Sequence, residues 1–145
     1  MTISRAATWL AGLWGGVLLC VGALSAPSAF ATLLAADAGR FVGGLFAQEA
    51  YLSLGMALVL FLIERKRSRD AATAGSGSVL SLDLVLILGA LFCTVAGYFA
   101  VQPMIVAARA GQGAWSFGAL HAVSGGLFVL KGLLVLTLAW RLGAR

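Results

Sequence analysis

Residues 41–63 have the sequence FVGGLFAQEAYLSLGMALVLFLI, and the charged run ERKRSRD follows directly at residues 64–70. Glu49 is the only charged residue of the first stretch. An α-helix of about 20 mostly apolar residues is long enough to cross the hydrocarbon core of a bilayer. Because backbone polar groups in lipid must bond to one another, this stretch is predicted to be a transmembrane helix, and the charged run is predicted to end it at the membrane surface.

Three further apolar segments of similar length occupy residues 6–31, 82–108 and 117–140. Hydrophobic residues make up 61% of the chain and charged residues 10%, with a mean hydropathy of +1.02. Soluble domains average about 45–50% and about 25% in these classes, so the composition favours a membrane protein. The predicted fold is all-α: a single transmembrane domain over residues 1–145, with four helices in an antiparallel up-down-up-down bundle.

The distribution of lysine and arginine predicts the orientation of the chain. With the N-terminus inside, seven of the ten basic residues lie on the cytoplasmic side and two lie outside, which the positive-inside rule favours. The expected location is therefore the bacterial inner membrane, with both termini cytoplasmic. The inner set is Arg5, Arg65, Lys66, Arg67, Arg69, Arg141 and Arg145, the outer set is Arg40 and Arg109, and Lys131 lies within the fourth segment.

Two segments, one after the charged run and one at the end of the first span, differ from plain membrane helix in composition. Residues 71–81 are rich in Ala, Gly and Ser, which together with the charged run predicts a cytoplasmic linker over residues 64–81. The first segment ends in Ala29-Phe30-Ala31, which resembles a signal-peptide cleavage site. Its apolar run is longer than the usual ~7–15 residues, so the segment is interpreted as a retained span, with cleavage as the alternative.

Glycine and proline suggest packing faces and an internal repeat. Small residues four apart let membrane helices approach closely, and we expect these sets to pack within the bundle rather than in a dimer. Pro27 and Pro103 lie near the ends of the first and third segments. This pattern predicts two parallel repeats with a bend in the first helix of each; the alternative is that a helix end simply tolerates proline. The small-residue sets are Gly12 with Gly16, Gly39 with Gly43, and Gly118 with Ala122 and Gly126.

Polar residues at membrane depth form the candidate site. They are expensive in lipid and usually face the bundle interior. At 1.5 Å per residue, Glu49 lies about 13 Å below Arg40, and Lys131 leans back toward the same level, so the two can pair directly or through water. The alternatives are a snorkelling or neutral Lys131 and a protonated Glu49. The candidate residues are Glu49, Gln102, His121, Lys131, Gln48 and Ser124, expected in the outer half of the bundle.

Motifs of enzymes and cofactor sites are missing from the sequence. It contains no phosphate-binding loop, H-E-x-x-H, C-x-x-C-H or G-x-S-x-G, so a catalytic role is not expected. Cys20 and Cys93 stand alone in apolar stretches and are expected to be free thiols. We expect no cofactor and no metal. The expected partners are the lipid bilayer and, in a homo-oligomer, other copies of the chain; nucleic acid is excluded because the basic residues form no continuous face.

Short motifs in the first two segments resemble a bacterial four-helix membrane family of unknown function. The family is related to small eukaryotic transmembrane proteins linked to cisplatin resistance. The resemblance implies a four-helix membrane protein and supplies no activity; a polar residue is expected near position 128, where this chain has Phe128. The motifs are Trp14-Gly15-Gly16, Ala26-Pro27, Phe30, Ala38-Gly39 and Gly43-Gly44-Leu45-Phe46, with Phe117, Leu120, His121 and Ser124 in the fourth segment.

Three functions are compatible with these observations. The first is a small transport or permeation component, indicated by ionisable groups at membrane depth. The second is a non-catalytic scaffold or assembly partner, indicated by the small-residue faces. The third is a membrane oxidoreductase or haem-binding protein, because the chain distantly resembles four-helix copper-resistance and porphyrinogen-oxidase proteins. Those carry several histidines, and the single His121 argues against a bis-histidine haem or copper site.

Overall fold

The computed structural model describes residues 3–144, and every regular element in that range is helical. Four of its helical rods are long and apolar enough to cross a membrane, so the predicted all-α fold with four membrane spans is confirmed. Arg145, one of the predicted inner basic residues, lies outside the described range. The elements are α1 (Ile3–Leu19), η1 (Cys20–Ser25), α2 (Ala26–Thr32), α3 (Ala35–Thr73), α4 (Leu82–Thr94), η2 (Val95–Ala100), α5 (Val101–Arg109) and α6 (Phe117–Gly143).

The helix α3 is longer than the predicted second span. It continues through the charged run to Thr73, so the predicted linker 64–81 is reduced to a loop at 74–81. Arginine, lysine, glutamate and alanine are good helix formers, and Arg67 donates a hydrogen bond to Glu64 at 2.5 Å one turn earlier. The loop turns at Gly75, whose φ of +69° suits glycine.

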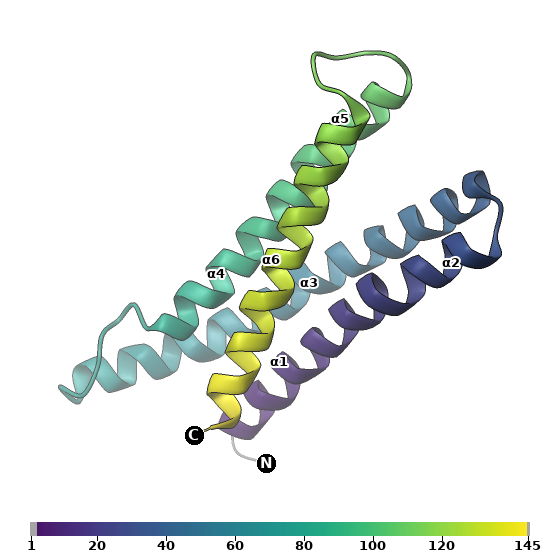
Figure 1. Cartoon of the computed structure of the whole chain (residues 1–145). Helices are drawn as coiled ribbons and strands as arrows, with labels where there is room; N and C mark the ends of the chain where they lie inside the picture. The colour runs from purple at the N-terminus through teal and green to yellow at the C-terminus, as the bar shows by residue number, and fades with distance from the viewer. Residues whose placement is uncertain (1–2, 145) are drawn as a thin grey trace.

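The four rods form two antiparallel hairpins (Figure 1). The first hairpin comprises α1, η1, α2 and α3, and the second comprises α4, η2, α5 and α6. Helix α1 packs against α3 and α6, and α4 packs against the same two helices. The backbones of α3 and α6 do not touch, so these two helices lie on a diagonal of the bundle.

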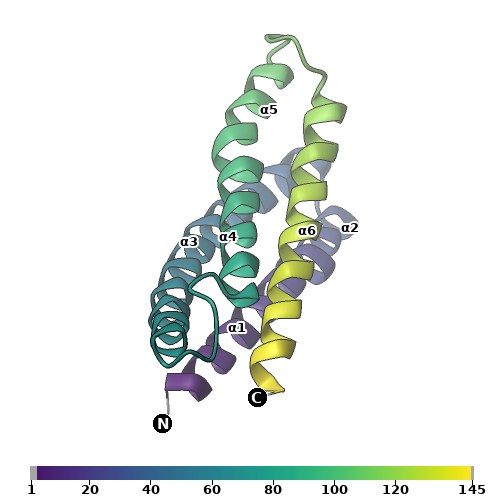
Figure 2. The same cartoon turned by 90° about the vertical axis from the view of Figure 1, so that its left-hand side faces the viewer.

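The two hairpins diverge at one end of the molecule. We call this the hairpin end, because it carries the turns at 33–34 and 110–116; the opposite end, with both chain ends and the loop at 74–81, is the terminal end. Figures 1 and 2 show the two turns far apart in space. The core reflects this divergence. One large cluster joins both hairpins, whereas Ala29, Ala38 and Val42 form a cluster within the first hairpin and Val101, Ile105 and Leu120 form one within the second.

A single π-helical turn interrupts each odd-numbered rod. The segment η1 ends two residues before Pro27, and η2 ends three residues before Pro103. The backbone N–H of Ala26 bonds to the carbonyl of Val21, and that of Val101 bonds to the carbonyl of Ala96, each five residues back. The order α-helix, π turn, α-helix with proline is therefore the same in both hairpins, which supports the predicted repeat.

The small-residue stripes are not packed inside the bundle, contrary to prediction. Space around each of their glycines is open, and Ala122 is exposed. Other glycines make the close contacts: a Cβ on Gly15 would lie 3.0 Å from Leu136, and one on Gly97 would lie 3.2 Å from Leu127. The spacing rule finds small faces on a helix but not the direction in which each face points.

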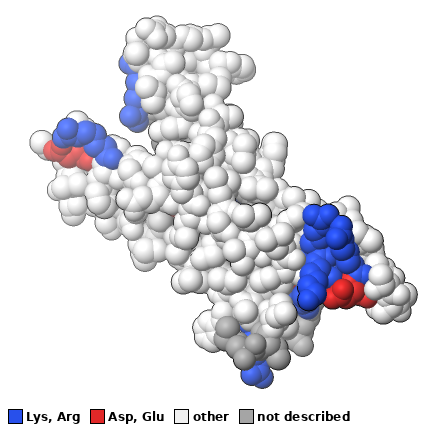
Figure 3. Space-filling model, turned by 180° about the vertical axis from the view of Figure 1, so that it is seen from behind, with Lys and Arg blue, Asp and Glu red and all other residues white. Residues whose placement is uncertain are grey.

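Charged side chains gather at the ends of the molecule. Figure 3 shows lysine and arginine at the extremities of one face and an uncharged belt between them. Trp9, Trp115 and Trp140 are 74%, 63% and 81% exposed, whereas Trp14 is fully buried. Exposed tryptophans near the ends of membrane helices are typical of an interfacial belt, so the surface fits a bilayer.

Candidate functional site

A buried ion pair joins the two hairpins near the middle of the membrane spans. The Nζ of Lys131 on α6 donates hydrogen bonds to both carboxylate oxygens of Glu49 on α3, at 2.8 Å each. The exposed fractions of the two side chains are only 4% and 3%. Because α3 and α6 lie on a diagonal, the pair crosses the centre of the bundle. The predicted pairing is present, and it is direct.

Two side chains of the first hairpin extend this pair into a chain of hydrogen bonds. Ser53, one helical turn from Glu49, donates its hydroxyl proton to Oε1 of that carboxylate. The indole Nε1–H of Trp14 donates to Oγ of Ser53 at 2.8 Å. The carboxylate therefore accepts three hydrogen bonds from two groups, Lys131 and Ser53, and within residues 3–144 no buried side-chain nitrogen or oxygen lacks a partner. Full hydrogen bonding is what makes a charge tolerable at this depth.

Two phenylalanine rings cover the ion pair on the side of the hairpin end. Phe46 on α3 and Phe128 on α6 meet edge to face, with ring centroids 5.0 Å apart. The Nζ of Lys131 lies 5.0 Å from the centroid of Phe128, which adds a cation–π contact. A Cβ on Gly22 of η1 would come within 2.6 Å of the Phe128 ring. Only glycine therefore lets the first hairpin close against this ring.

The other side of the ion pair is an apolar core. Leu60, Ile87 and Leu138 have no exposed surface and pack in the large cluster that joins both hairpins. Cys93 on α4 is also buried, and it lies midway between Gly89 and Gly97, which face Leu134 and Leu127 of α6, so it is at the level of Lys131. The pair therefore lies at the boundary between the shared apolar core, on its terminal side, and the region where the two hairpins diverge.

The remaining candidate residues do not converge on this pair. Gln48 and His121 are exposed, and His121 stacks on Phe117 with ring centroids 5.5 Å apart. Gln102 is half-buried, and Ser124 donates to the backbone carbonyl of Gly97 at 3.0 Å within its own hairpin. The prediction of one cluster of six is therefore wrong in its membership. The face of α6 that carries His121 would meet the first hairpin in a parallel bundle, but at this level the hairpins have separated.

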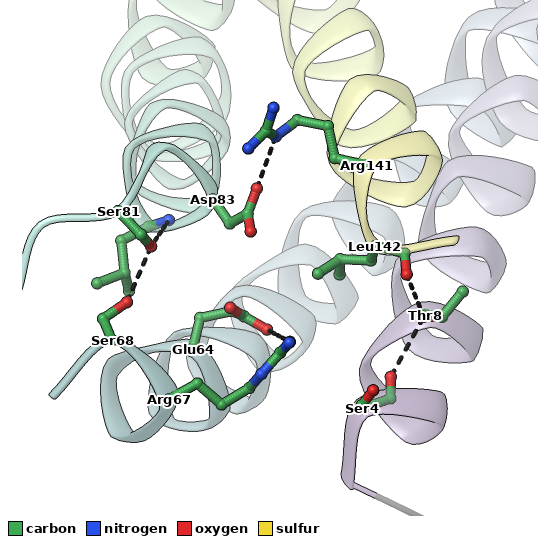
Figure 4. Close-up of polar contacts among 10 residues, drawn as sticks. Ser4, Thr8, Glu64, Arg67, Ser68, Ser81, Asp83, Arg141 and Leu142 are labelled. Atoms are coloured by element: carbon green, nitrogen blue, oxygen red, sulfur yellow. Dashed lines mark hydrogen bonds and ion pairs between the residues drawn. The ribbon is translucent and has the colours of Figure 1, made fainter. Parts of the chain in front are cut away.

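Sequence reasoning missed a second group of polar contacts at the terminal end (Figure 4). Asp83 has no exposed surface and accepts a hydrogen bond from Nε of Arg141 at 2.8 Å, which joins α4 to α6. Ser68 donates to Ser81 at 2.9 Å, and Ser81 caps the N-terminus of α4 by accepting from the backbone of Leu84. The signal was available, because a serine two residues before an acid is typical of a helix N-terminus.

Further contacts at the same end involve the first hairpin. Figure 4 also shows Thr8 donating to the carbonyl of Leu142 at 3.1 Å, which joins α1 to α6. A cavity of about 490 Å³ lies between the end of α3 and the loop at 74–81, and buried Glu64 is part of its wall. The terminal end is therefore held by polar bonds among all four rods.

The described residues offer no obvious place for a metal ion. No group of three or more His, Cys, Asp or Glu side chains in residues 3–144 could hold a metal ion. His121 contacts an aromatic ring, and the ligands of a haem site would need a second strong donor near it.

These features define a class, the four-helix membrane protein with an ion pair buried between two hairpins. Residues 9–114 match a protein family described as a domain of unknown function, DUF4149. Because this match covers most of the chain, the protein belongs to that family. The matched region includes Glu49 and ends before α6, which carries Lys131. No curated protein and no solved structure matches the chain.

Proposed function

We propose that this protein is a small membrane transport component in which the Glu49–Lys131 pair couples movement of the two hairpins to binding of a proton or a charged solute. The observation that carries the proposal is the ion pair itself, with both partners at least 96% buried and located between two repeated hairpins. An ionisable group at membrane depth usually marks a functional site. In many transporters the binding site lies between internal repeats.

The chemistry of the pair favours such coupling. The carboxylate of Glu49 compensates the ammonium of Lys131 only while both are charged. A proton on Glu49 would remove that compensation, and a solute anion or cation could replace either partner. Either event disrupts the central polar contact between the hairpins, because a charge left without its partner is costly where water is excluded. The pair can therefore act as an element with two states.

The orientation and the finer family relationship stay proposals. Exposed Arg65, Lys66 and Arg69 all lie at the terminal end, which supports a cytoplasmic location of that end in a bacterial inner membrane. The hairpin end would then face the periplasm. The proposed kinship with small eukaryotic membrane proteins linked to cisplatin resistance rests on the short motifs of the first hairpin and adds no activity.

Proton flux into proteoliposomes tests the proposal. Purified protein is reconstituted into vesicles that contain the pH indicator pyranine and potassium, and valinomycin imposes an interior-negative potential. Proton uptake with the native chain should exceed that of protein-free vesicles. Glu49→Gln keeps the size of the side chain but removes its charge and one of its two acceptor oxygens, so uptake should fall to the protein-free level.

A matched control on the same helix is Asp37→Asn. Asp37 lies at the hairpin end of α3, where its partner Arg40 is on the same helix and exposed. This change also converts an acid to its amide, and it should leave proton uptake unaltered. Equal uptake in the native chain and Glu49→Gln, or no uptake above empty vesicles, would refute proton coupling at this site.

A scaffold or assembly partner is the second candidate, and one observation favours it. Gly12 and Gly16 lie open on α1, where they line an apolar groove of about 660 Å³ together with Trp9 and Leu13. A stripe of this kind suits close packing of another membrane helix. Gentle extraction from native membranes should then recover a stable assembly, and Gly12→Leu should disrupt it. A chain that migrates alone in both forms would argue against this role.

A further inference from the structure

Aromatic rings form the contacts between the hairpins nearest the hairpin end. Phe46 meets Phe128 on one side of the bundle, and Tyr51 on α3 meets Phe99 in η2 on the other, with ring centroids 5.5 Å apart. Beyond these two pairs, each hairpin has its own small core. The rings therefore mark the level at which the hairpins separate.

Polar bonds between the hairpins have the opposite distribution. Within the described range, they occur at the Glu49–Lys131 pair and at the terminal end, where Thr8 bonds to Leu142 and Ser68 to Ser81. The charged side chains of the hairpin end bond or stack within their own hairpin: Arg40 with Asp37, and Arg109 with Phe117. Separation of the hairpins at that end would break edge-to-face ring contacts and no ion pair other than the central one.

Both π turns lie at this same level. Gly22 of η1 is against the ring of Phe128, and Phe99 of η2 is against the ring of Tyr51. In a π turn, the backbone hydrogen bonds join residues five apart in the chain and not four apart. Such turns commonly mark places where a helix bends or serves a function. Each hairpin therefore has a deformable turn in contact with one of the ring pairs.

We propose that Phe46 and Phe128 are a gate between the hairpin end and the Glu49–Lys131 pair. When the hairpins part at the hairpin end, the rings separate and water reaches the pair from that side alone. The apolar core with Leu60, Ile87 and Leu138 blocks the terminal side. The inference deepens the proposed function because it assigns the side from which a proton or charged solute enters, but its test needs no transport.

Cys93 is a natural reporter for this gate, because it is buried at the level of Lys131. Cys20 is exposed and is removed by Cys20→Ser. A membrane-impermeant methanethiosulfonate is added to sealed vesicles of either orientation, and its disulfide with Cys93 is measured by mass spectrometry over time. A separate Gln112→Cys variant identifies the vesicles whose hairpin end faces the reagent.

Phe128→Ala should raise the initial rate of Cys93 modification about tenfold, since it removes the ring pair and its buried surface. The increase should appear only when the reagent is on the side of the hairpin end. Phe41→Ala is the matched control, because Phe41 is exposed on the same helix as Phe46. Its rate should equal that of the parent.

Phe46→Ala removes the partner ring and should give the same increase in rate. It therefore tests the gate even if Phe128→Ala does not fold. A thermal melt of each purified variant separates a folded protein from a misfolded one. Equal rates in a folded gate variant and Phe41→Ala would overturn the proposal, as would faster modification from the terminal side. A side-specific increase without proton flux would support the gate and refute proton coupling at the Glu49–Lys131 pair.

Discussion

The clearest test of the structure is a double-mutant cycle on the buried ion pair. The changes are Glu49→Leu, Lys131→Met and the two together. Each single change leaves one charge in the centre of the bundle, where the exposed fraction of both side chains is below 5%. Loss of one partner of a buried pair is strongly destabilising, by about 3–5 kcal/mol, because the other charge remains uncompensated.

Protonation limits this penalty, since a lone buried charge can be neutralised. At pH 7, neutralising an ordinary lysine takes about 4.6 kcal/mol and protonating an ordinary glutamate takes about 3.7 kcal/mol. We therefore expect each single change to lower the free energy of unfolding by about 3–4.5 kcal/mol. The double variant has no buried charge and should lose less than about 2 kcal/mol, because apolar replacement of a buried pair is often neutral.

Unfolding by sodium dodecyl sulfate, followed by circular dichroism in mixed micelles, supplies the four free energies. The interaction energy from the cycle should exceed about 2 kcal/mol, which is the range of residues in direct contact. If the double variant is destabilised by the sum of the two single changes, or if either single change has an effect below about 1 kcal/mol, the ion pair is not the one described.

The other predictions concern hydrogen bonds on either side of this pair. Trp14→Phe keeps the buried ring but leaves Ser53 without its indole donor, so the free energy of unfolding in the same assay should fall by about 1–2 kcal/mol; an unchanged value would contradict the Trp14–Ser53 bond. Asp83→Asn should lower the free energy of unfolding by about 2–3 kcal/mol, since fully buried Asp83 binds a partly exposed Arg141. Asp37 is exposed, so Asp37→Asn should change this free energy by less than about 0.5 kcal/mol. Similar losses in the two acid variants would show that Asp83 is not held as described.

Much of the fold could be predicted because lipid leaves so few choices. Any long apolar segment must be a helix, and its length follows from the thickness of the bilayer, so three of the four spans agree with prediction to within a few residues. The level of Glu49 relative to Lys131 followed from the rise per residue. The end of α3 did not follow, because helix formers such as Arg67 continue a helix beyond the membrane surface.

The membership of the site was less predictable than its depth. Lys131 and His121 are within about 80° of each other around α6, yet one is buried and the other exposed. The difference arises from the crossing of the hairpins, which depends on contacts such as Gly22 with Phe128 rather than on hydropathy. Asp83 is not among the predicted site residues, because it lies at the very start of the third apolar segment and not at membrane depth; its burial results from packing of α4 against α3 and α6.

The π turns have a consequence for changes in chain length. A wide turn holds one residue more than the α-helix that would replace it, so removal of one residue from Cys20–Ser25 could restore regular helical winding. Because the extra residue is absorbed within that one turn, everything beyond it would keep its direction around the rod. Pro27 and Ala29 would stay on the same side of the helix, and the first hairpin would still close at its tip. The same deletion in the regular helix α1 would instead rotate everything beyond it by about 100°. The π turn is therefore the place in this rod where the loss of one residue changes length and not phase.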